Sequence, residues 1–293
     1  MDGIRGAVHI GVLKALEEND INVNIIGGTS SGSLVAALYA MGYSPCHILE
    51  IFKRYGKLIT AIEKRPILDG LGSYITTKKF KFTGINKGNK IENLYNEFAS
   101  KKNIFKMYDI KMPIVIPTID LTDGKEYVFT NSIPKNSTEN KYISDISIGT
   151  AVRASSSFPG IFCPCKFKEH IFLDGGTLNN SPINEVKSQG ADKIITVNFE
   201  PIKIDSNSSA FDIALKAIDI MGNKIIEENM KKSDIILTIP IKDKVGFLDV
   251  NKIEDLYNYG FNETMKKIED IKKLAKWWKI VFTKLEKCGK IIK

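Results

Sequence analysis

The sequence predicts an α/β protein with three layers, in which helices cover both faces of a mostly parallel central sheet. Short apolar runs of strand length alternate with segments of helical periodicity along most of the 293 residues. Such alternation is typical of strands buried between two helical layers. A composition of 43% hydrophobic and 26% charged residues provides a full core. We find no repeat and no linker, and expect a main domain over residues 1–250 and a helical extension over 251–293.

Local signals define the elements of the N-terminal third. Val8, Val12 and Leu16 lie on one face of a helix, because their spacing is four residues. Ser44 and Pro45 provide an N-cap and a first-turn proline for a later helix. The predicted elements are a helix over 8–16, a strand over 23–26, helices over 33–41, 44–55 and 91–98, and loops over most of 60–90.

A β-hairpin is the first element predicted beyond residue 100. Two runs suited to strands, 113–119 and 126–130, flank the turn dipeptide Asp123-Gly124. The remaining predicted elements are a helix over 146–153, strands over 171–173, 193–198 and 235–239, a helix over 211–229 and a helical segment from 251 onward.

The chain is basic, with 42 Lys and Arg against 34 Asp and Glu and a net charge of +8. A basic protein suggests nucleic acid or an anionic membrane as a partner. Only four of these residues are Arg, the usual reader of bases and phosphates. The lysines are spread along the chain, so we expect no nucleic-acid partner.

Residues 263–293 hold ten Lys and four acidic residues, and apolar residues recur there at helical spacing. A basic amphipathic helix of this kind is typical of contact with an anionic membrane surface. The alternative is that the apolar stripe packs on the core and lysines cover its outside. The stripe consists of Ile268, Ile271, Ala275, Trp278, Phe282, Leu285 and Ile292, and Trp277 stands beside it.

The four cysteines (Cys46, Cys163, Cys165 and Cys288) are too few and too scattered for a disulfide framework. The sequence also contains no signal peptide and no apolar run long enough to cross a bilayer. Together with the few cysteines, this predicts a cytoplasmic protein. The basic helix leaves peripheral contact with the inner membrane surface as an alternative. Cys163 and Cys165 with His170 could be read as a metal site, but we favour buried thiols and expect no metal.

The strongest chemical signal is G-x-S-x-G, formed by Gly28, Ser30 and Gly32. A predicted strand precedes it and a predicted helix follows it, which is the setting of a nucleophile elbow. The serine hydroxyl would then lie at a helix N-terminus, where negative charge is favoured. The alternative is a plain turn, because Gly and Ser are common in turns.

A serine nucleophile needs a base, and the three histidines do not provide one. No His follows His170, so the order of a Ser–acid–His triad is absent, and His9 precedes Ser30 without a convincing acid between them. The candidate base is Asp174, which ends an apolar run and precedes Gly175 and Gly176. The alternative for this segment is an ordinary Asp-Gly turn.

The N-terminal segment Gly3-Ile4-Arg5-Gly6 leads into the first helix. Free backbone N–H groups at a helix N-terminus form an anion site, which would serve acyl transfer as an oxyanion hole, and Arg5 adds positive charge. A disordered start of the chain is the alternative.

Four blocks in this order resemble the patatin-like phospholipases, lipid acyl hydrolases that use a Ser–Asp dyad, and the likeness spans roughly residues 3–200. Within that family, the sequence most resembles the small bacterial members that consist of little more than this domain. The blocks are Gly3-Ile4-Arg5-Gly6, Gly28 to Gly32, Arg153-Ala154-Ser155-Ser156 with Phe158-Pro159-Gly160-Ile161-Phe162, and Asp174-Gly175-Gly176.

The resemblance implies a patatin-like fold and hydrolysis of (phospho)lipid acyl esters through an acyl-enzyme, without Ca²⁺ or any other cofactor. Ser30 would be the nucleophile and Asp174 its base. The amides around Gly3 and Ile4, with Arg5 and Gly6, would form the oxyanion hole. Gly28 and Gly32 would shape the elbow, and Arg153, Gly175 and Gly176 would support the site.

The family's oxyanion loop has three glycines and follows a hydrophobic strand, whereas this sequence begins Met1-Asp2-Gly3. The strand and the first two glycines have no counterpart. A late reading-frame start, a truncated chain or a member that dispenses with the strand would each explain this. Two alternatives to a hydrolase follow: an inactive protein that binds lipid or a partner, and an acyltransferase with the same dyad.

Three further residues near these blocks have structural interpretations. Asp120 and Asp123 resemble a calcium loop only in part, and we interpret them as the hairpin turn. His9 is interpreted as structural, on the inner face of the first helix. Arg153 either pairs with an acid behind the site or caps the C-terminal end of its helix.

Overall fold

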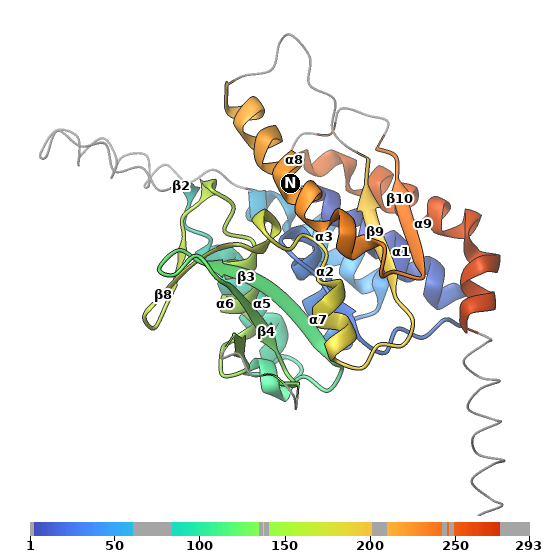
Figure 1. Ribbon diagram of the computed structural model, residues 1–293, viewed down its shortest axis with the longest axis horizontal. Coiled ribbons are helices and arrows are strands. Elements are labelled where there is room, and N and C mark those ends of the chain that lie inside the picture. Colours follow the sequence, from blue (N-terminus) through green and yellow to red (C-terminus); the bar gives the residue numbers. More distant parts are fainter. Residues whose placement is uncertain are drawn as a thin grey trace, which may run out of the picture.

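A computed structural model describes residues 3–60, 84–134, 137, 141–200, 210–241, 245 and 249–275 (Figure 1). The predicted loop over 60–90 lies mostly outside these residues, as do Cys288 and the stripe beyond Ala275. None of the described helices is long and apolar enough to cross a membrane.

Apart from the helix over Ile183–Ser188, the labelled α-helices lie where the sequence predicts them, within a few residues at each end. The helix over Asn89–Ser100 buries one face, and the helix over Pro45–Thr60 begins at the predicted proline. The labelled α-helices are α1 (Ala7–Glu18), α2 (Ser31–Ala40), α3 (Pro45–Thr60), α5 (Asn89–Ser100), α6 (Ile148–Ser155), α7 (Ile183–Ser188), α8 (Ala210–Met230) and α9 (Ile253–Lys266), and residues 268–275 are also helical.

The main sheet has the strand order β5-β4-β3-β8-β7, and β1 also pairs with β3. The hairpin of β3 and β4 is confirmed. β2, β5, β6, β7 and α7 have no counterpart among the predicted elements. The strands are β1 (Ile26–Gly27), β2 (Gly84–Asn86), β3 (Ile114–Asp120), β4 (Glu126–Thr130), β5 (Tyr142–Ile143), β6 (Gly160–Phe162), β7 (Cys165–Phe167), β8 (His170–Asp174), β9 (Ile195–Phe199) and β10 (Ile235–Ile239).

The prediction of a mostly parallel sheet is wrong for this main sheet. β3 pairs antiparallel with both β4 and β8, and β7 pairs antiparallel with β8, whereas β1–β3 and β4–β5 are parallel. The physical reason is the connections: β3–β4 and β7–β8 are joined by tight turns, which reverse the chain, and not by helical crossovers. β7 was too short to be predicted, so its hairpin with β8 was not foreseen.

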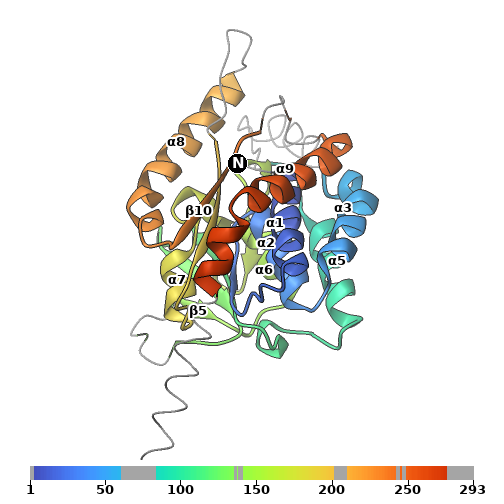
Figure 2. The ribbon, with the colours of Figure 1, turned by 90° about the vertical axis from the view of Figure 1, so that its right-hand side faces the viewer.

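A parallel pair with a helical crossover does occur in the C-terminal part. β9 and β10 are parallel along five residue pairs, and α8 connects them. Figure 2 shows the pair between α8 on one side and α1 with α9 on the other. The alternation of strand and helix that predicted an α/β fold is therefore observed in β9, α8 and β10. The fold class is α/β with a mixed main sheet.

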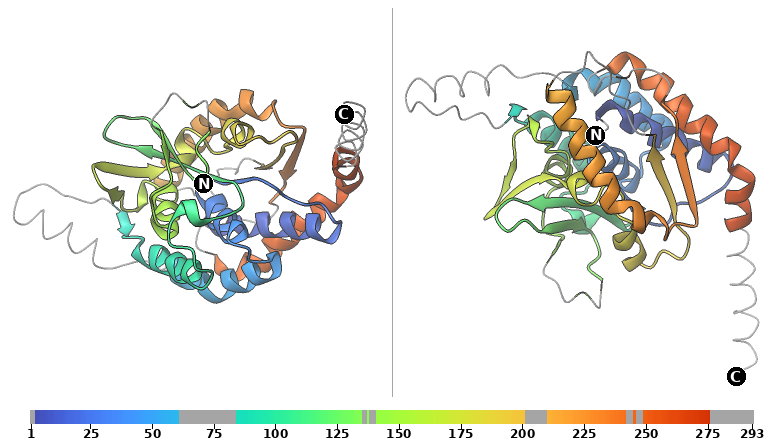
Figure 3. Two further views of the ribbon diagram at one scale, coloured as in Figure 1. Left: turned by 90° about the horizontal axis from the view of Figure 1, so that it is seen from below. Right: turned by 45° about the horizontal axis from the view of Figure 1, so that its top comes forward.

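α9 lies against α1 with almost no space between their backbones (Figures 2 and 3). A Cβ on Gly11 would fall 1.9 Å from the Tyr257 carbonyl oxygen, and one on Gly260 would fall 2.0 Å from the Val8 carbonyl oxygen. Ile268 and Ile271, the first two positions of the apolar stripe, are buried in the core. These two positions therefore pack on the domain, as in the alternative for this stripe, whereas its third position, Ala275, is exposed.

Candidate active site

β1 and β8 pair with successive parts of β3, and their C-terminal ends lie close together. β1 runs parallel to the start of β3, with Gly27 opposite Val115, and β8 runs antiparallel to its end, with Asp174 opposite Thr118. The Gly28 N–H donates to the Val115 carbonyl at 3.1 Å. The turn after β1 and the last residue of β8 are thereby brought together over residues 115–118.

Ser30 occupies the sharp turn between β1 and α2. Its φ of 53° and ψ of −122° are unusual for a residue with a side chain and mark a strained position. Gly28 is required there, because a Cβ on it would lie 2.4 Å from the Gly32 carbonyl oxygen. The nearest atom to a Cβ on Gly32 would be His9 Nε2 at 3.7 Å. The strand–turn–helix setting of the G-x-S-x-G motif is present, but the strand is Ile26–Gly27 and not the predicted 23–26.

The Ser30 hydroxyl donates to Asp174 Oδ2 at 2.5 Å across a sequence separation of 144 residues. Asp174 is 1% exposed, and its other carboxylate oxygen accepts the Gly176 N–H at 2.8 Å. A Cβ on Gly175 would lie 2.4 Å from the Pro117 carbonyl oxygen, so this position must lack a side chain. A buried carboxylate held in this way can accept a proton from the serine hydroxyl.

Side chains from α6 and its C-terminal end hold the backbone of Ser30. The Ser155 hydroxyl accepts the Ser30 N–H at 3.1 Å, and the Ser156 hydroxyl donates to the Ser30 carbonyl at 3.2 Å. Ser33 donates to the same carbonyl at 2.6 Å. The two serines belong to the predicted block at 153–156, but their contact with Ser30 was not predicted. These bonds keep the strained turn in one conformation.

The N-terminal segment Gly3–Gly6 forms a 3₁₀ turn beside Ser30's turn. A Cβ on Gly6 would lie 3.0 Å from the Ser31 carbonyl oxygen, which places the segment against the start of α2. Arg5 is buried, and its Nη2 donates to the Val245 carbonyl at 3.2 Å. The segment therefore packs against the start of α2, while the Arg5 side chain bonds to the backbone of a distant segment.

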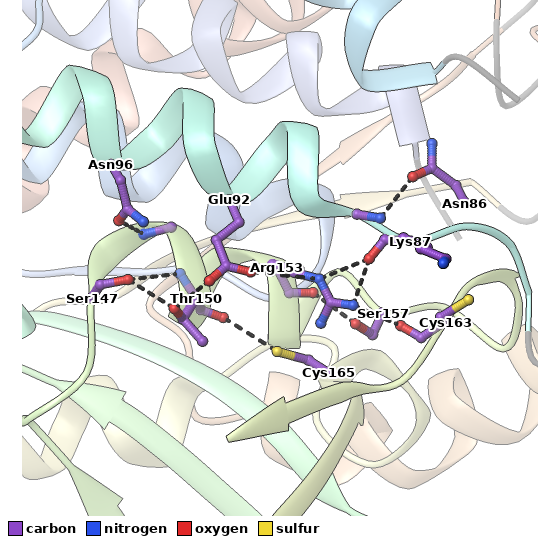
Figure 4. A network of polar contacts seen from close by, with 12 residues as sticks. Asn86, Lys87, Glu92, Asn96, Ser147, Thr150, Arg153, Ser157, Cys163 and Cys165 are labelled. Atoms are coloured by element: carbon purple, nitrogen blue, oxygen red, sulfur yellow. Dashed lines mark hydrogen bonds and ion pairs between the residues drawn. The ribbon is translucent and has the colours of Figure 1, made fainter. Parts of the chain in front are cut away.

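Arg153 binds the main-chain carbonyls of Lys87 and Cys163 (Figure 4). Its Nε donates to the Lys87 carbonyl at 2.9 Å, and its Nη2 donates there at 2.5 Å and to the Cys163 carbonyl at 3.5 Å. Glu92 lies 3.7 Å from Nε as an ion pair. Of the two predicted roles, pairing with an acid is observed, and the residue joins α6 to the segment before α5.

Cys163, Cys165 and His170 are not brought together as a site. Cys165 is buried and Cys163 half-buried, and His170 Nδ1 instead lies 2.5 Å from Asp120 Oδ2. Within the described residues, no three His, Cys, Asp or Glu side chains are grouped to hold a metal ion.

Asp120 is part of the β3–β4 turn, as predicted, since its carboxylate accepts the Thr122 N–H at 2.9 Å and its carbonyl accepts the Gly124 N–H at 2.8 Å. Burial by itself would raise the pKa of this carboxyl. The bonds from Thr122, His170 and Ile171 outweigh burial and lower the pKa below its ordinary value. His9, beside α2, makes an edge contact with Phe199 at 5.4 Å between ring centroids.

Comparison with known proteins agrees with these blocks. The sequence pattern of the family described as Patatin-like phospholipase matches residues 3–187. Lysophospholipase NTE1 of Scheffersomyces stipitis is 28% identical over 290 residues, which cover 89% of this chain and 17% of that protein. Patatin-like phospholipase domain-containing protein 6 of Mus musculus is 32% identical over 198 residues, 67% of this chain and 13% of that protein.

The chain thus spans about a fifth or less of the length of these curated relatives. Among solved structures, VipD from Legionella pneumophila matches with a TM-score of 0.47 and 15% sequence identity. That match covers 92% of this chain and 65% of VipD.

Proposed function

Since the chain belongs to the patatin-like phospholipase family, we propose that it hydrolyses acyl esters of phospholipids or lysophospholipids. Ser30 is the nucleophile and Asp174 the general base. The observation that carries this proposal is the hydrogen bond from the Ser30 hydroxyl to the buried Asp174 carboxylate. The lysophospholipase name of one relative supports a lipid substrate.

In the first half of the reaction, Asp174 accepts the Ser30 proton while Oγ forms a bond to the ester carbonyl carbon. The oxyanion that develops is held by the backbone N–H groups of Gly3–Gly6, beside the start of α2. When the intermediate collapses, the ester C–O bond breaks and Asp174 returns the proton to the departing alcohol. The acyl group remains on Ser30.

In the second half, a water molecule attacks the acyl-enzyme and gives its proton to Asp174. Collapse of this intermediate releases the fatty acid and restores the Ser30 hydroxyl with that proton. Because a carboxylate is a weaker base than an imidazole, more of the rate must come from the oxyanion amides. The bonds from Ser155, Ser156 and Ser33 to the Ser30 backbone support this by fixing the direction of Oγ.

The test is covalent labelling with a long-chain fluorophosphonate, followed by peptide mapping. We expect one adduct on Ser30, lost in Ser30→Ala, together with release of fatty acid from lysophosphatidylcholine. Labelling of a different serine, or no labelling of a folded chain, would contradict the proposal. A labelled enzyme whose acyl group passes to an added alcohol in preference to water would indicate an acyltransferase.

A further inference from the structure

A group of buried and half-buried polar side chains lies behind the Asp174 turn and has no part in the reaction just described. Asn179 is at its centre, and its Nδ2 donates to Glu126 Oε2 and to Glu185 Oε2, both at 2.9 Å. Lys141 Nζ lies 3.5 Å from the other oxygen of each carboxylate. β4, α7 and the segment before β5 thus each contribute one charged residue to this group, the Asn179 cluster.

The Asn179 cluster brings two carboxylates close together. Glu126 and Glu185 both accept from the Asn179 amide nitrogen, and each lies 3.5 Å from the ammonium group of Lys141. Burial, and then the neighbouring charge of Glu185, raise the pKa of Glu126 above its ordinary value. The amide of Asn179 and the ammonium group of Lys141 offset the repulsion between the two carboxylates and hold them in place.

The main chain of Asn179 connects this cluster to both halves of the reacting pair. Its N–H donates to the Gly175 carbonyl at 2.8 Å, which closes the turn that follows Asp174. Its carbonyl accepts the hydroxyl of Thr29 at 2.8 Å, and Thr29 immediately precedes Ser30. Asn179 therefore lies where a shift of its backbone would move Ser30 relative to Asp174.

We propose that Asn179, held by the Glu126–Glu185 pair, is a positioning residue that keeps the Ser30 hydroxyl against the Asp174 carboxylate through the Thr29 hydroxyl. This inference rests on the proposed function of Ser30 and Asp174. The cluster touches no reacting atom: it acts through the backbone of Asn179. Its effect belongs to the rate of the chemical step, because alignment within about 1 Å can change a rate by ~10²-fold.

The first test removes the connecting hydroxyl. Thr29→Val keeps the size of the side chain but loses the bond to the Asn179 carbonyl, and we expect the rate of Ser30 labelling by fluorophosphonate to fall roughly 10- to 100-fold. Thr29→Ser restores the hydroxyl and should recover most of the rate. Steady-state hydrolysis of lysophosphatidylcholine should show the loss in kcat, with KM changed little.

Thr196→Val is the matched control. Thr196 is also buried, and its hydroxyl lies 2.6 Å from that of Ser233, in the segment between α8 and β10. Thr196→Val and Thr29→Val should both unfold at a lower temperature than the wild type, but Thr196→Val should label at the wild-type rate. Equal labelling rates for Thr29→Val and Thr196→Val, both as folded proteins, would overturn the inference.

The second test follows the ionisation of Glu126. Glu126 ionises as the pH rises through its raised pKa, and its charge then lies beside that of Glu185, so the wild-type labelling rate should fall there. Glu185→Gln removes the neighbouring charge that contributes to this raised pKa, so the fall should begin at a lower pH. Glu92→Gln, next to Arg153, is the control and should keep the wild-type profile. A fall at the same pH in Glu185→Gln as in the wild type would contradict the role of the pair.

The outcomes separate the two proposals. A wild-type chain that labels at Ser30 while Thr29→Val labels equally fast overturns the positioning role alone. A folded wild-type chain that does not label overturns the proposed function, and the positioning role falls with it.

Discussion

The Ser30–Asp174 pair and the Arg153 network are both polar assemblies around one buried charged residue, and both include residues of sequence blocks that resemble one family. They differ in what their side chains bond to. Ser30 and Asp174 bond to each other, side chain to side chain, whereas Arg153 donates mainly to the carbonyls of Lys87 and Cys163. A side chain whose partners are main-chain carbonyls fixes the positions of segments, and a pair of complementary side chains can exchange a proton.

The comparison shows that residues of the same sequence motif can have different roles. Arg153 and Ser155 belong to one block of four residues, yet Ser155 contacts the Ser30 backbone and Arg153 faces the segment before α5. In a helix, residues two positions apart point in different directions. The block therefore serves the reacting pair on one side and the packing of α5 on the other.

Asp174→Asn should have the largest effect, and this effect should be on the rate of hydrolysis and not on stability. The amide cannot accept the Ser30 proton, so we expect hydrolysis to fall by about 10²–10⁴-fold. The free energy of unfolding should change little, because the amide can keep the contact with Gly176. Initial rates of fatty-acid release and urea unfolding measure the two effects. Near-wild-type activity would remove Asp174 from the dyad.

Gly28→Ala and Gly32→Ala test the backbone that carries Ser30. A Cβ on Gly28 would lie 2.4 Å from a main-chain oxygen, whereas one on Gly32 has no neighbour closer than 3.7 Å. We expect Gly28→Ala to lose about 3 kcal/mol of unfolding free energy and Ser30 labelling with it. Gly32→Ala should cost less than about 1 kcal/mol, since Ala is favoured in helices. Equal losses in urea unfolding would show that the motif needs both glycines.

Arg153→Met should produce the opposite pattern to Asp174→Asn. It removes the donor to the Lys87 carbonyl and the ion-pair partner of Glu92, so we expect a loss of about 2 kcal/mol in unfolding free energy. The labelling rate of the folded fraction should stay near the wild-type value, measured at a temperature where the variant is folded. A large fall in that rate would give Arg153 a part in the site and end the distinction between the two regions.

Asp120→Asn should have the smallest effect, and one that depends on pH. The folded pKa of Asp120 is lowered, so the carboxylate stabilises the protein above the ordinary Asp pKa, and this is lost as the pH falls through the folded value. The variant should lose about 1 kcal/mol near neutral pH and approach the wild type in acid. Thermal unfolding across this pH range measures it; a constant difference would assign the effect to packing.

The helices and the hairpin of β3 and β4 could be predicted because their signals are local. Helical periodicity, the proline at position 45 and the turn Asp123-Gly124 act over a few residues, and they placed α1, α3 and β4 correctly. β6 and β7 have three residues each and no such signal, so they were missed. Without β7, the reversal of the chain before β8 could not be seen.

The sequence by itself determined the two turns that carry Ser30 and Asp174, because each depends on glycines that permit a close backbone approach. Only the tertiary structure decided that these turns meet. β1 and β8 must pair in succession with β3, in opposite directions, to bring together residues 144 positions apart. The same holds for the Asn179 cluster, whose carboxylates come from β4 and α7. Strand pairing and buried charge pairs join distant segments, and local periodicity holds no information about such partners.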